Sequence, residues 1–180
     1  FVCGFHVQFI QTHLPAYITD KGLAPLLGAW SLALIGLFNI VGSFLSGWSG
    51  QIYSKPKLLA GIYSSRAAVI AVFIFSPLSG MSVLIFSAAM GILWLSTVPL
   101  TTSLIAQTQG LKFLSTLAGL VFFSHQVGGF LGAWLGGRLY DVSGNYEAMW
   151  IAAILFGLLA TVIHLPIREQ AGRLAQAEFK

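Results

Sequence analysis

The sequence has very little charge. Nine lysines and arginines and five aspartates and glutamates occur among 180 residues, so that 8% of the chain is charged. An average soluble domain carries about 25% charged residues. This shortage excludes an ordinary soluble globular domain. With 57% hydrophobic residues, the composition indicates a membrane protein that crosses the bilayer several times.

Cysteines and acidic residues are also scarce, and each shortage excludes a class of protein. The single cysteine, Cys3, cannot form an internal disulfide, and we interpret it as a small core residue. No acidic residue lies inside an apolar run, and no carboxylate pair shares a helix face in the membrane. We therefore predict no enzyme activity, no cofactor and no metal site. The net charge of +4 is scattered over helix ends, which indicates membrane topology rather than nucleic-acid binding.

The chain begins inside an apolar run, at Phe1, with neither an initiator methionine nor a charged segment in front of it. A signal peptide would need that charged segment and a small-residue cleavage site. We interpret the first residue as a cut and the chain as a piece of a longer protein.

Six apolar runs are each about the 20 residues that a helix needs to cross a bilayer. They predict an all-α membrane protein whose residues 1–167 form a six-helix transmembrane bundle, followed by a cytoplasmic tail at 168–180. The predicted spans are residues 1–18, 26–48, 57–76, 81–106, 113–140 and 147–166.

The basic residues predict the orientation of the bundle. Lys21 and Arg138 fall on one side of the membrane, and Arg66 falls inside it. Because basic residues concentrate on the cytoplasmic side, the opposite side is predicted to be cytoplasmic and to hold both chain ends. Six basic residues lie there: Lys55, Lys57, Lys112, Arg168, Arg173 and Lys180.

The fifth run contains the most distinctive pattern, and we expect the other helices to surround it. It carries a polar pair, His125 and Gln126, near mid-depth. Its glycines recur on one face, where a neighbouring backbone can approach closely. These glycines are Gly128, Gly129, Gly132 and Gly136.

Polar residues at mid-depth distinguish four runs from the other two. The third run is apolar apart from Arg66, and the sixth is apolar on every side from Ile151 to Leu159. Polar groups in hydrocarbon are costly, so we predict that four helices line an aqueous cavity and two pack outside against lipid. The polar positions are His6, His13 and Gln11 in the first run, Asn39 in the second, Trp94, Thr97 and Thr101 in the fourth, and His125 and Gln126 in the fifth.

Several of these residues have a structural and a functional explanation, and both stay open. His125 and Gln126 would form either a solute or proton site or a hydrogen bond between helices. Arg66 would snorkel to the interface, or bind a backbone carbonyl, a residue outside this chain or an anion. Trp94 would be packing or the wall of a solute site. The histidines also raise a haem protein as an alternative.

Near the outer end of the fifth run, Arg138 and Asp141 lie three residues apart. They predict an ion pair at the membrane interface or, alternatively, a gate at a cavity mouth. Pro99 interrupts the fourth run and would let that helix bend.

Over essentially its whole length the chain resembles the C-terminal six-helix half of a major facilitator superfamily transporter. The loop GWSGQIYSKPKLL at 47–59 is similar to the superfamily's G-x-L-x-D-R-x-G-R-R motif in a degenerate form, with Gln51 in place of the acid. Four segments resemble bacterial members related to monocarboxylate transporters and oxalate/formate antiporters. They are FHVQFIQTHLPAY, WLSTVPLT, SHQVGGFLGAWLGG and RLYDVSGNY. The charged pair typical of the monocarboxylate branch is replaced by Asn39 and Ser43.

The resemblance implies half of a 12-helix fold in the cytoplasmic (inner) membrane of a bacterium. It implies secondary active transport of a small organic solute, such as a carboxylate or another anion, by alternating access, with protons or a counter-anion as coupling partner. An N-terminal half of the same chain would complete the cavity. The alternative is a non-transporting membrane scaffold or a degenerate fragment. The expected solute contacts are His6, Gln11, Asn39, Trp94, Thr97, His125 and Gln126, and the expected gating or structural residues are Arg66, Pro99, Gly128, Gly129, Gly132, Gly136, Arg138 and Asp141.

Overall fold

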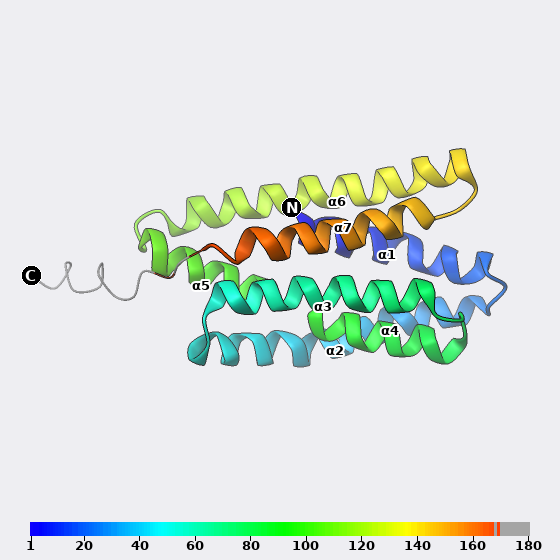
Figure 1. Ribbon diagram of the computed structural model, residues 1–180, viewed down its shortest axis with the longest axis horizontal. Helices are drawn as coiled ribbons and strands as arrows, with labels where there is room; N and C mark the ends of the chain where they lie inside the picture. The colour runs from blue at the N-terminus through cyan, green and yellow to red at the C-terminus, as the bar shows by residue number, and fades with distance from the viewer. Residues whose placement is uncertain (168, 170–180) are drawn as a thin grey trace, which may run out of the picture.

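A computed structural model describes residues 1–167 and 169, and within them the chain is helical with no strand. The predicted all-α class is confirmed. The helices run along the long axis of the molecule, and their connections, except the one between α4 and α5, lie at its two ends (Figure 1). Apart from residue 169, the predicted tail at 168–180 lies outside the described residues. The helices are α1 (Val2–Asp20), α2 (Pro25–Ile52), α3 (Lys55–Phe75), α4 (Gly80–Leu93), α5 (Thr97–Gln109), α6 (Leu114–Ser143) and α7 (Glu147–His164).

Five helical segments are long and apolar enough to cross a membrane: α2, α3, α6, α7 and the segment Gly80–Gln109, which contains α4 and α5. The chain is thus a multi-pass membrane protein. α1 has 19 residues but is less apolar than these five, because Gln8, Gln11 and Thr12 follow one another along it. The six predicted spans lie over these helices and stay a prediction as membrane segments. The fourth span, 81–106, is interrupted between α4 and α5.

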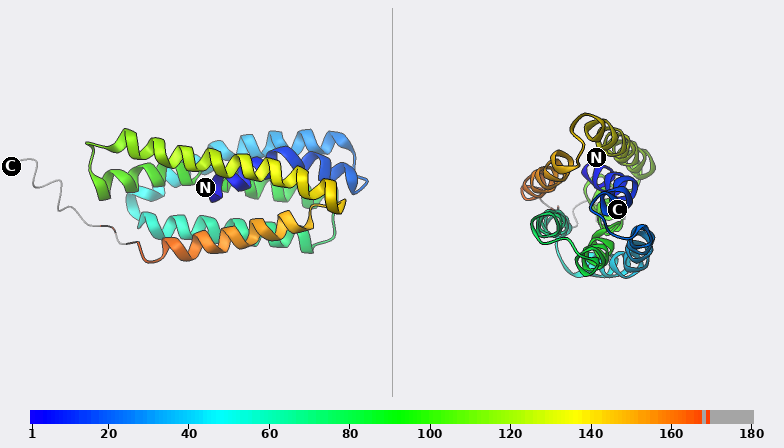
Figure 2. Two further views of the ribbon diagram at one scale, coloured as in Figure 1. Left: turned by 90° about the horizontal axis from the view of Figure 1, so that it is seen from above. Right: turned by 90° about the vertical axis from the view of Figure 1, so that its right-hand side faces the viewer.

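The most enclosed helix is α1, not α6. Ten of the 19 residues of α1 are buried, and it packs against α6, α2 and α7 (Figure 2). In α6, by contrast, the buried residues are four glycines, and large side chains such as Phe123 and Trp134 are exposed. The expectation that the chain surrounds residues 119–141 is therefore wrong, because α6 contributes only its glycine face to the bundle.

Three helix pairs make the closest contacts: α1 with α6, α2 with α4, and α3 with α7. Glycines permit the approach in each pair. A Cβ added at Gly132 of α6 would lie 2.5 Å from the Phe5 carbonyl oxygen of α1, and one at Gly91 of α4 would lie 2.8 Å from the Ile35 oxygen of α2. Small residues at such seams let backbones approach, and van der Waals packing then holds the helices together in lipid.

An aromatic cluster joins α1, α3, α4 and α7 toward one end of the bundle. The Phe73 and Phe86 rings stack with centroids 4.1 Å apart, and the Trp150 ring meets Phe9 edge to face at 4.8 Å. Such pairs stabilise beyond the area that they bury, by about 0.5–1.5 kcal/mol each. The cluster therefore holds these four helices together at this end of the bundle.

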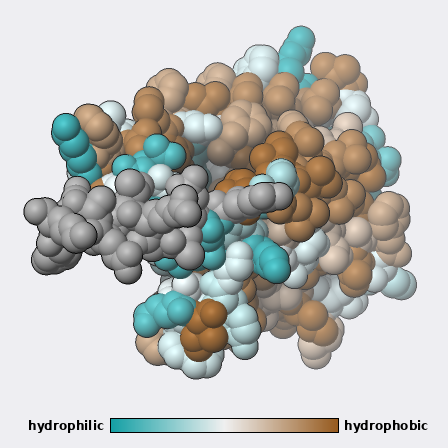
Figure 3. Space-filling model, turned by 60° about the vertical axis from the view of Figure 1, so that its left-hand side comes forward, coloured by the Kyte–Doolittle hydropathy of each residue, from teal (hydrophilic) through white to brown (hydrophobic). Residues whose placement is uncertain are grey.

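Apolar side chains cover the flanks of the molecule, as expected of a surface in lipid or against another membrane domain. Phe44 of α2 and Phe130 of α6 are exposed. Figure 3 shows this apolar surface on one side of the molecule, with hydrophilic residues toward the end that faces the viewer. That end of the bundle carries the α2–α3 and α5–α6 connections, with Lys57 and Lys112 near them. It is the end predicted to face the cytoplasm.

Candidate functional site

The break between α4 and α5 lies deep in the bundle. α4 ends at Leu93 and α5 begins at Thr97, with residues 94–96 between them. Pro99 accounts for the break, because it has no N–H to donate to the carbonyl of Leu95 and its ring would clash with that carbonyl. The Ser96 hydroxyl instead donates to the Ile92 oxygen at 2.5 Å. The break therefore leaves backbone groups of both helix ends without partners in their own helix.

Arg66 of α3 satisfies the carbonyl side of the break. Its Nε and Nη2 donate to the Leu93 oxygen at 3.1 and 2.5 Å, and Nη2 also donates to the Trp94 oxygen. The residue is 0% exposed, and its guanidinium carbon lies 5.4 Å from the centre of the Tyr63 ring. The C-terminus of a helix carries partial negative charge and attracts a cation. The snorkelling interpretation of Arg66 is thus wrong, and the backbone-carbonyl alternative is the one that the structure shows.

One nitrogen of this guanidinium, Nη1, is buried and has no hydrogen-bond partner among residues 1–167 and 169. No ion pair to a carboxylate within 4.0 Å involves Arg66 in the part of the chain that the structure describes. A buried cation without a counter-charge is costly. This free donor at mid-bundle is a chemical feature for which a solute anion is a suitable partner.

Asn39 of α2 satisfies the amide side of the break. Its Oδ1 accepts a hydrogen bond from the Leu95 N–H at 3.0 Å and another from the Ser43 hydroxyl at 3.3 Å. Arg66 and Asn39, from two different helices, therefore hold the two ends of the interrupted helix.

The break also collects Trp94, Thr97 and Cys3. The Thr97 hydroxyl donates to the Cys3 Sγ at 3.4 Å, and that thiol faces the Trp94 oxygen at 3.9 Å. All three residues are buried. Sequence reasoning had placed Asn39, Trp94 and Thr97 among the solute contacts. It missed Cys3, because nothing along the sequence marks a lone cysteine in an apolar run as the neighbour of a cation.

His125 lies beside this cluster, whereas Gln126 and Gln11 do not belong to it. The His125 side chain is near the Cys3 thiol and is half-buried. Gln126 and Gln11 are exposed. Gln126 lines a shallow depression on the α1–α6 surface, with Gln8 and Gly129. The predicted set thus divides into a group at the break and two exposed residues outside it, of which Gln126 lies on the α1–α6 surface.

His6 forms no hydrogen bond with a residue of either group in the described part of the chain. It is fully buried, and its Nε2 lies 2.7 Å from the Ala153 oxygen of α7. His13 similarly places Nε2 2.9 Å from the Ala133 oxygen of α6. Each ring therefore has a packing explanation as a hydrogen bond between helices.

The residues predicted for gating have different surroundings. A Cβ at Gly128 would overlap the Phe1 carbonyl oxygen, and one at Gly136 would lie 2.5 Å from the His13 ring, so both glycines sit directly against α1. Arg138 and Asp141 are exposed, and no ion pair joins them among the described residues. The predicted interfacial pair is wrong, because two charges in water gain little from pairing.

Individual relatives, rather than a family model, show the family of this chain. No family model matches the chain. The chain is 27% identical over 174 residues to the uncharacterized MFS-type transporter YcxA of Bacillus subtilis, covering 92% of this chain and 41% of that protein. It is 31% identical over 168 residues to monocarboxylate transporter 13 of Rattus norvegicus, covering 89% and 39%. The corresponding protein of Bos taurus is 29% identical over 167 residues, covering 89% and 39%. The chain spans about 40% of the length of these relatives. The helical fold and these matches together identify the chain as part of a major facilitator superfamily protein, corresponding to one half of that fold.

Proposed function

We propose that the polypeptide containing this chain carries a small organic anion, such as a monocarboxylate, across a bacterial inner membrane by alternating access. Both ends of the chain would lie in the cytoplasm, and this chain would supply the C-terminal half of the transporter. The names of the relatives support transport as the activity, and two of them are named for monocarboxylates.

The observation that carries the proposal is the interrupted helix at mid-bundle. Discontinuous helices form the solute and ion sites of many secondary transporters, because the partial charges of their ends face the cavity. Here the N-terminus of α5 supplies partial positive charge, and Arg66 adds a full charge with one free donor. Both favour an anion over a cation or a neutral solute.

The break is enclosed in this conformation, since Arg66 and Thr97 are buried. A solute anion would reach it only when neighbouring helices move. The break would let the α4–α5 segment bend, and the glycines between α1 and α6 would let these two helices slide past each other. The exposed apolar faces of α2 and α6 would pack against the other half, and rocking of the two halves would open the site to each side in turn.

His125 is the candidate for proton coupling. An imidazole can accept and release a proton, and His125 lies near the Cys3 thiol at the break. Transfer of a proton to this imidazole would accompany binding of the anion.

The test is uptake by proteoliposomes that hold the protein expressed from its complete coding sequence. Labelled L-lactate and its neutral analogue lactamide would be compared for the native protein, Arg66→Gln and Lys57→Gln. Lys57→Gln is the matched control, because it removes an exposed cation from the same helix. We expect lactate uptake without lactamide uptake, and a fall of at least about tenfold in Arg66→Gln alone, the equivalent of one charge-assisted hydrogen bond.

Elution of each variant as a folded monodisperse species would separate lost function from lost folding. Folded native protein that takes up none of a panel of small carboxylates would refute the proposal and favour the scaffold alternative. Uptake unaffected by Arg66→Gln would refute the role of the break in binding the anion.

A further inference from the structure

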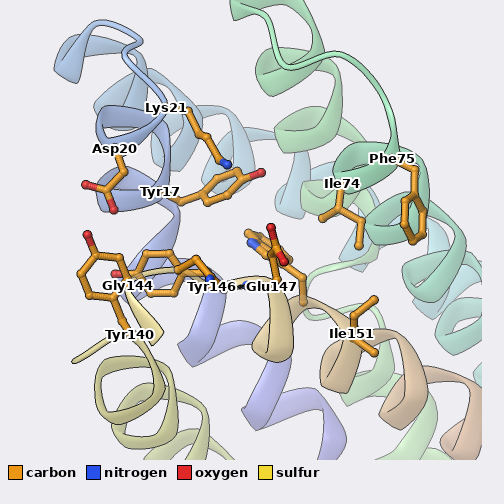
Figure 4. A pocket seen from close by; sticks show the side chains of 12 residues that line it. Tyr17, Asp20, Lys21, Ile74, Phe75, Tyr140, Gly144, Tyr146, Glu147 and Ile151 are labelled. Atoms are coloured by element: carbon orange, nitrogen blue, oxygen red, sulfur yellow. Dashed lines mark hydrogen bonds between the residues drawn. The ribbon is translucent and has the colours of Figure 1, made fainter. Parts of the chain in front are cut away.

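A pocket of about 490 Å³ lies at the end of the bundle opposite the predicted cytoplasmic side. Four helix ends meet there: the C-termini of α1, α3 and α6 and the N-terminus of α7 (Figure 4). None of the residues at the α4–α5 break lines it. It is therefore separate from the proposed transport site.

Charges of both signs line this pocket without neutralising one another. Lys21 and Asp20 follow one another at the end of α1, and Glu147 opens α7. No ion pair within 4.0 Å joins Lys21 to either carboxylate in the described part of the chain. The Lys21 nitrogen instead lies 5.8 Å from the centre of the Tyr17 ring, and Asp20 faces Tyr140 (Figure 4).

A buried donor without an acceptor lies in the wall of the same pocket. Trp150 is 2% exposed, and its indole N–H has no hydrogen-bond partner in the part of the chain that the structure describes. An unsatisfied buried N–H is rare and costly in a native protein. Burial and the nearby carboxylate of Asp20 also raise the pKa of the Tyr146 phenol, which keeps that hydroxyl protonated and able to donate. The pocket thus combines donors and a cation, which suit an anion, with two carboxylates, which suit an ammonium group.

We propose that this pocket binds the zwitterionic headgroup of a phosphatidylethanolamine lipid. The phosphate would accept from Lys21 and from the Trp150 indole, and the primary ammonium would donate to Glu147 and Asp20 between aromatic rings. Such rings also attract a cation through their faces.

The position of the pocket favours a lipid over a free zwitterion. Phe75, which is 76% exposed, lines the pocket together with Ile74 and Ile151, and this apolar side leads from the polar pocket onto the flank of the bundle. Acyl chains of a lipid whose headgroup fills the pocket would run down this flank. A free molecule such as phosphoethanolamine would leave the apolar side chains without a partner.

Native mass spectrometry of the complete protein, released from vesicles of equal parts phosphatidylethanolamine, phosphatidylcholine and phosphatidylglycerol, tests the proposal. Phosphatidylcholine is the matched ligand, because its trimethylated nitrogen has no N–H to donate to a carboxylate. We expect retained phosphatidylethanolamine to exceed retained phosphatidylcholine. Glu147→Gln should lower that ratio by about threefold, the scale of an exposed ion pair. Lys21→Gln should lower the retention of both lipids by a similar factor and leave their ratio unchanged, because both headgroups carry the phosphate. Lys112→Gln, at the opposite end of the bundle, should change neither the ratio nor the retention.

Equal retention of the two lipids, a ratio unaffected by Glu147→Gln, or total retention unaffected by Lys21→Gln would each overturn the proposal. Millimolar free phosphoethanolamine added to the sample distinguishes the source of the headgroup: displacement of the lipid would overturn the lipid assignment, and persistence supports it. The measurement requires no transport, so it stands or fails independently of the proposed function.

Discussion

Replacing Gly42 of α2 by alanine should separate two helices and so disturb the α4–α5 break. A Cβ built at Gly42 overlaps the Ile92 carbonyl and lies 2.7 Å from the Ile92 Cα. Carbon atoms in contact are normally about 3.5–4.0 Å apart, so α2 and α4 must separate by about 1 Å. Ile92 is three residues before Leu95, and Gly42 is three residues after Asn39. The 3.0 Å hydrogen bond between Asn39 and the Leu95 N–H would therefore lengthen beyond bonding distance.

The expected cost combines overpacking with the loss of that hydrogen bond. Inserting a methyl group into a packed site costs about 1–3 kcal/mol. A lost hydrogen bond that leaves a buried group unsatisfied costs about 1–3 kcal/mol more. The two costs together are about 2–6 kcal/mol. Since about 1 kcal/mol shifts Tm by roughly 2–4 °C in a domain of this size, the variant should melt roughly 4–24 °C lower.

Thermal unfolding in detergent, followed by size-exclusion chromatography, measures this difference. The control is Gly36→Ala in the same helix, because a Cβ at Gly36 meets no atom within 4 Å. Alanine there should leave Tm unchanged or raise it slightly through helix propensity. Equal melting of the two variants would refute the described packing of α2 on α4.

Two further substitutions test other parts of the fold and site. Gly132→Ala places a Cβ 2.5 Å from the Phe5 oxygen and should lower Tm by several degrees. The control is Gly119→Ala in the same helix, whose Cβ meets no atom of the described residues within 4 Å and should leave Tm unchanged. Equal Tm values for the two variants would contradict the described packing of α1 on α6. His125→Ala should change the pH dependence of lactate uptake, because it removes the imidazole beside the break. An unchanged pH profile would exclude His125 from coupling.

The helical class could be predicted from the sequence, because an apolar run long enough to cross a bilayer can satisfy its backbone hydrogen bonds there by forming a helix. The break in the fourth run could not be located in the same way. Residues 81–106 are nearly continuously apolar, and Pro99 alone does not say where the ends of the two helices will find partners. Those partners, Arg66 and Asn39, come from other helices and are known only once the bundle is assembled.

Arg66 illustrates why the site was only partly predictable. When α3 is considered alone, Arg66 is expected to snorkel, since an unpaired cation in the bilayer is costly and water at the interface is its nearest partner. The structure provides a nearer partner, the carbonyl end of α4, which exists only because the neighbouring helix is interrupted. Residue polarity did indicate Asn39, Trp94 and Thr97, which do lie together.

The central place of α1 was also hidden in the sequence. It is less apolar than the other long helices, yet it is the most enclosed. Its histidines reach carbonyl oxygens of α6 and α7, so polar side chains on α1 pack between helices as well as toward a cavity. Hydropathy does not distinguish these two uses of a polar residue.

Water accessibility at the break tests the central claim most directly. Single cysteines would be introduced at Asn39 and, as a lipid-facing control, at Ile85, which is exposed on α4. Both would be placed in the complete protein, reconstituted in vesicles, with Cys3 and any other cysteine replaced. We expect a membrane-impermeant thiol reagent to label position 39 during turnover, lactate to slow this labelling, and position 85 to stay unlabelled. Labelling of position 39 no faster than that of position 85, with or without lactate, would refute a solute site at the break.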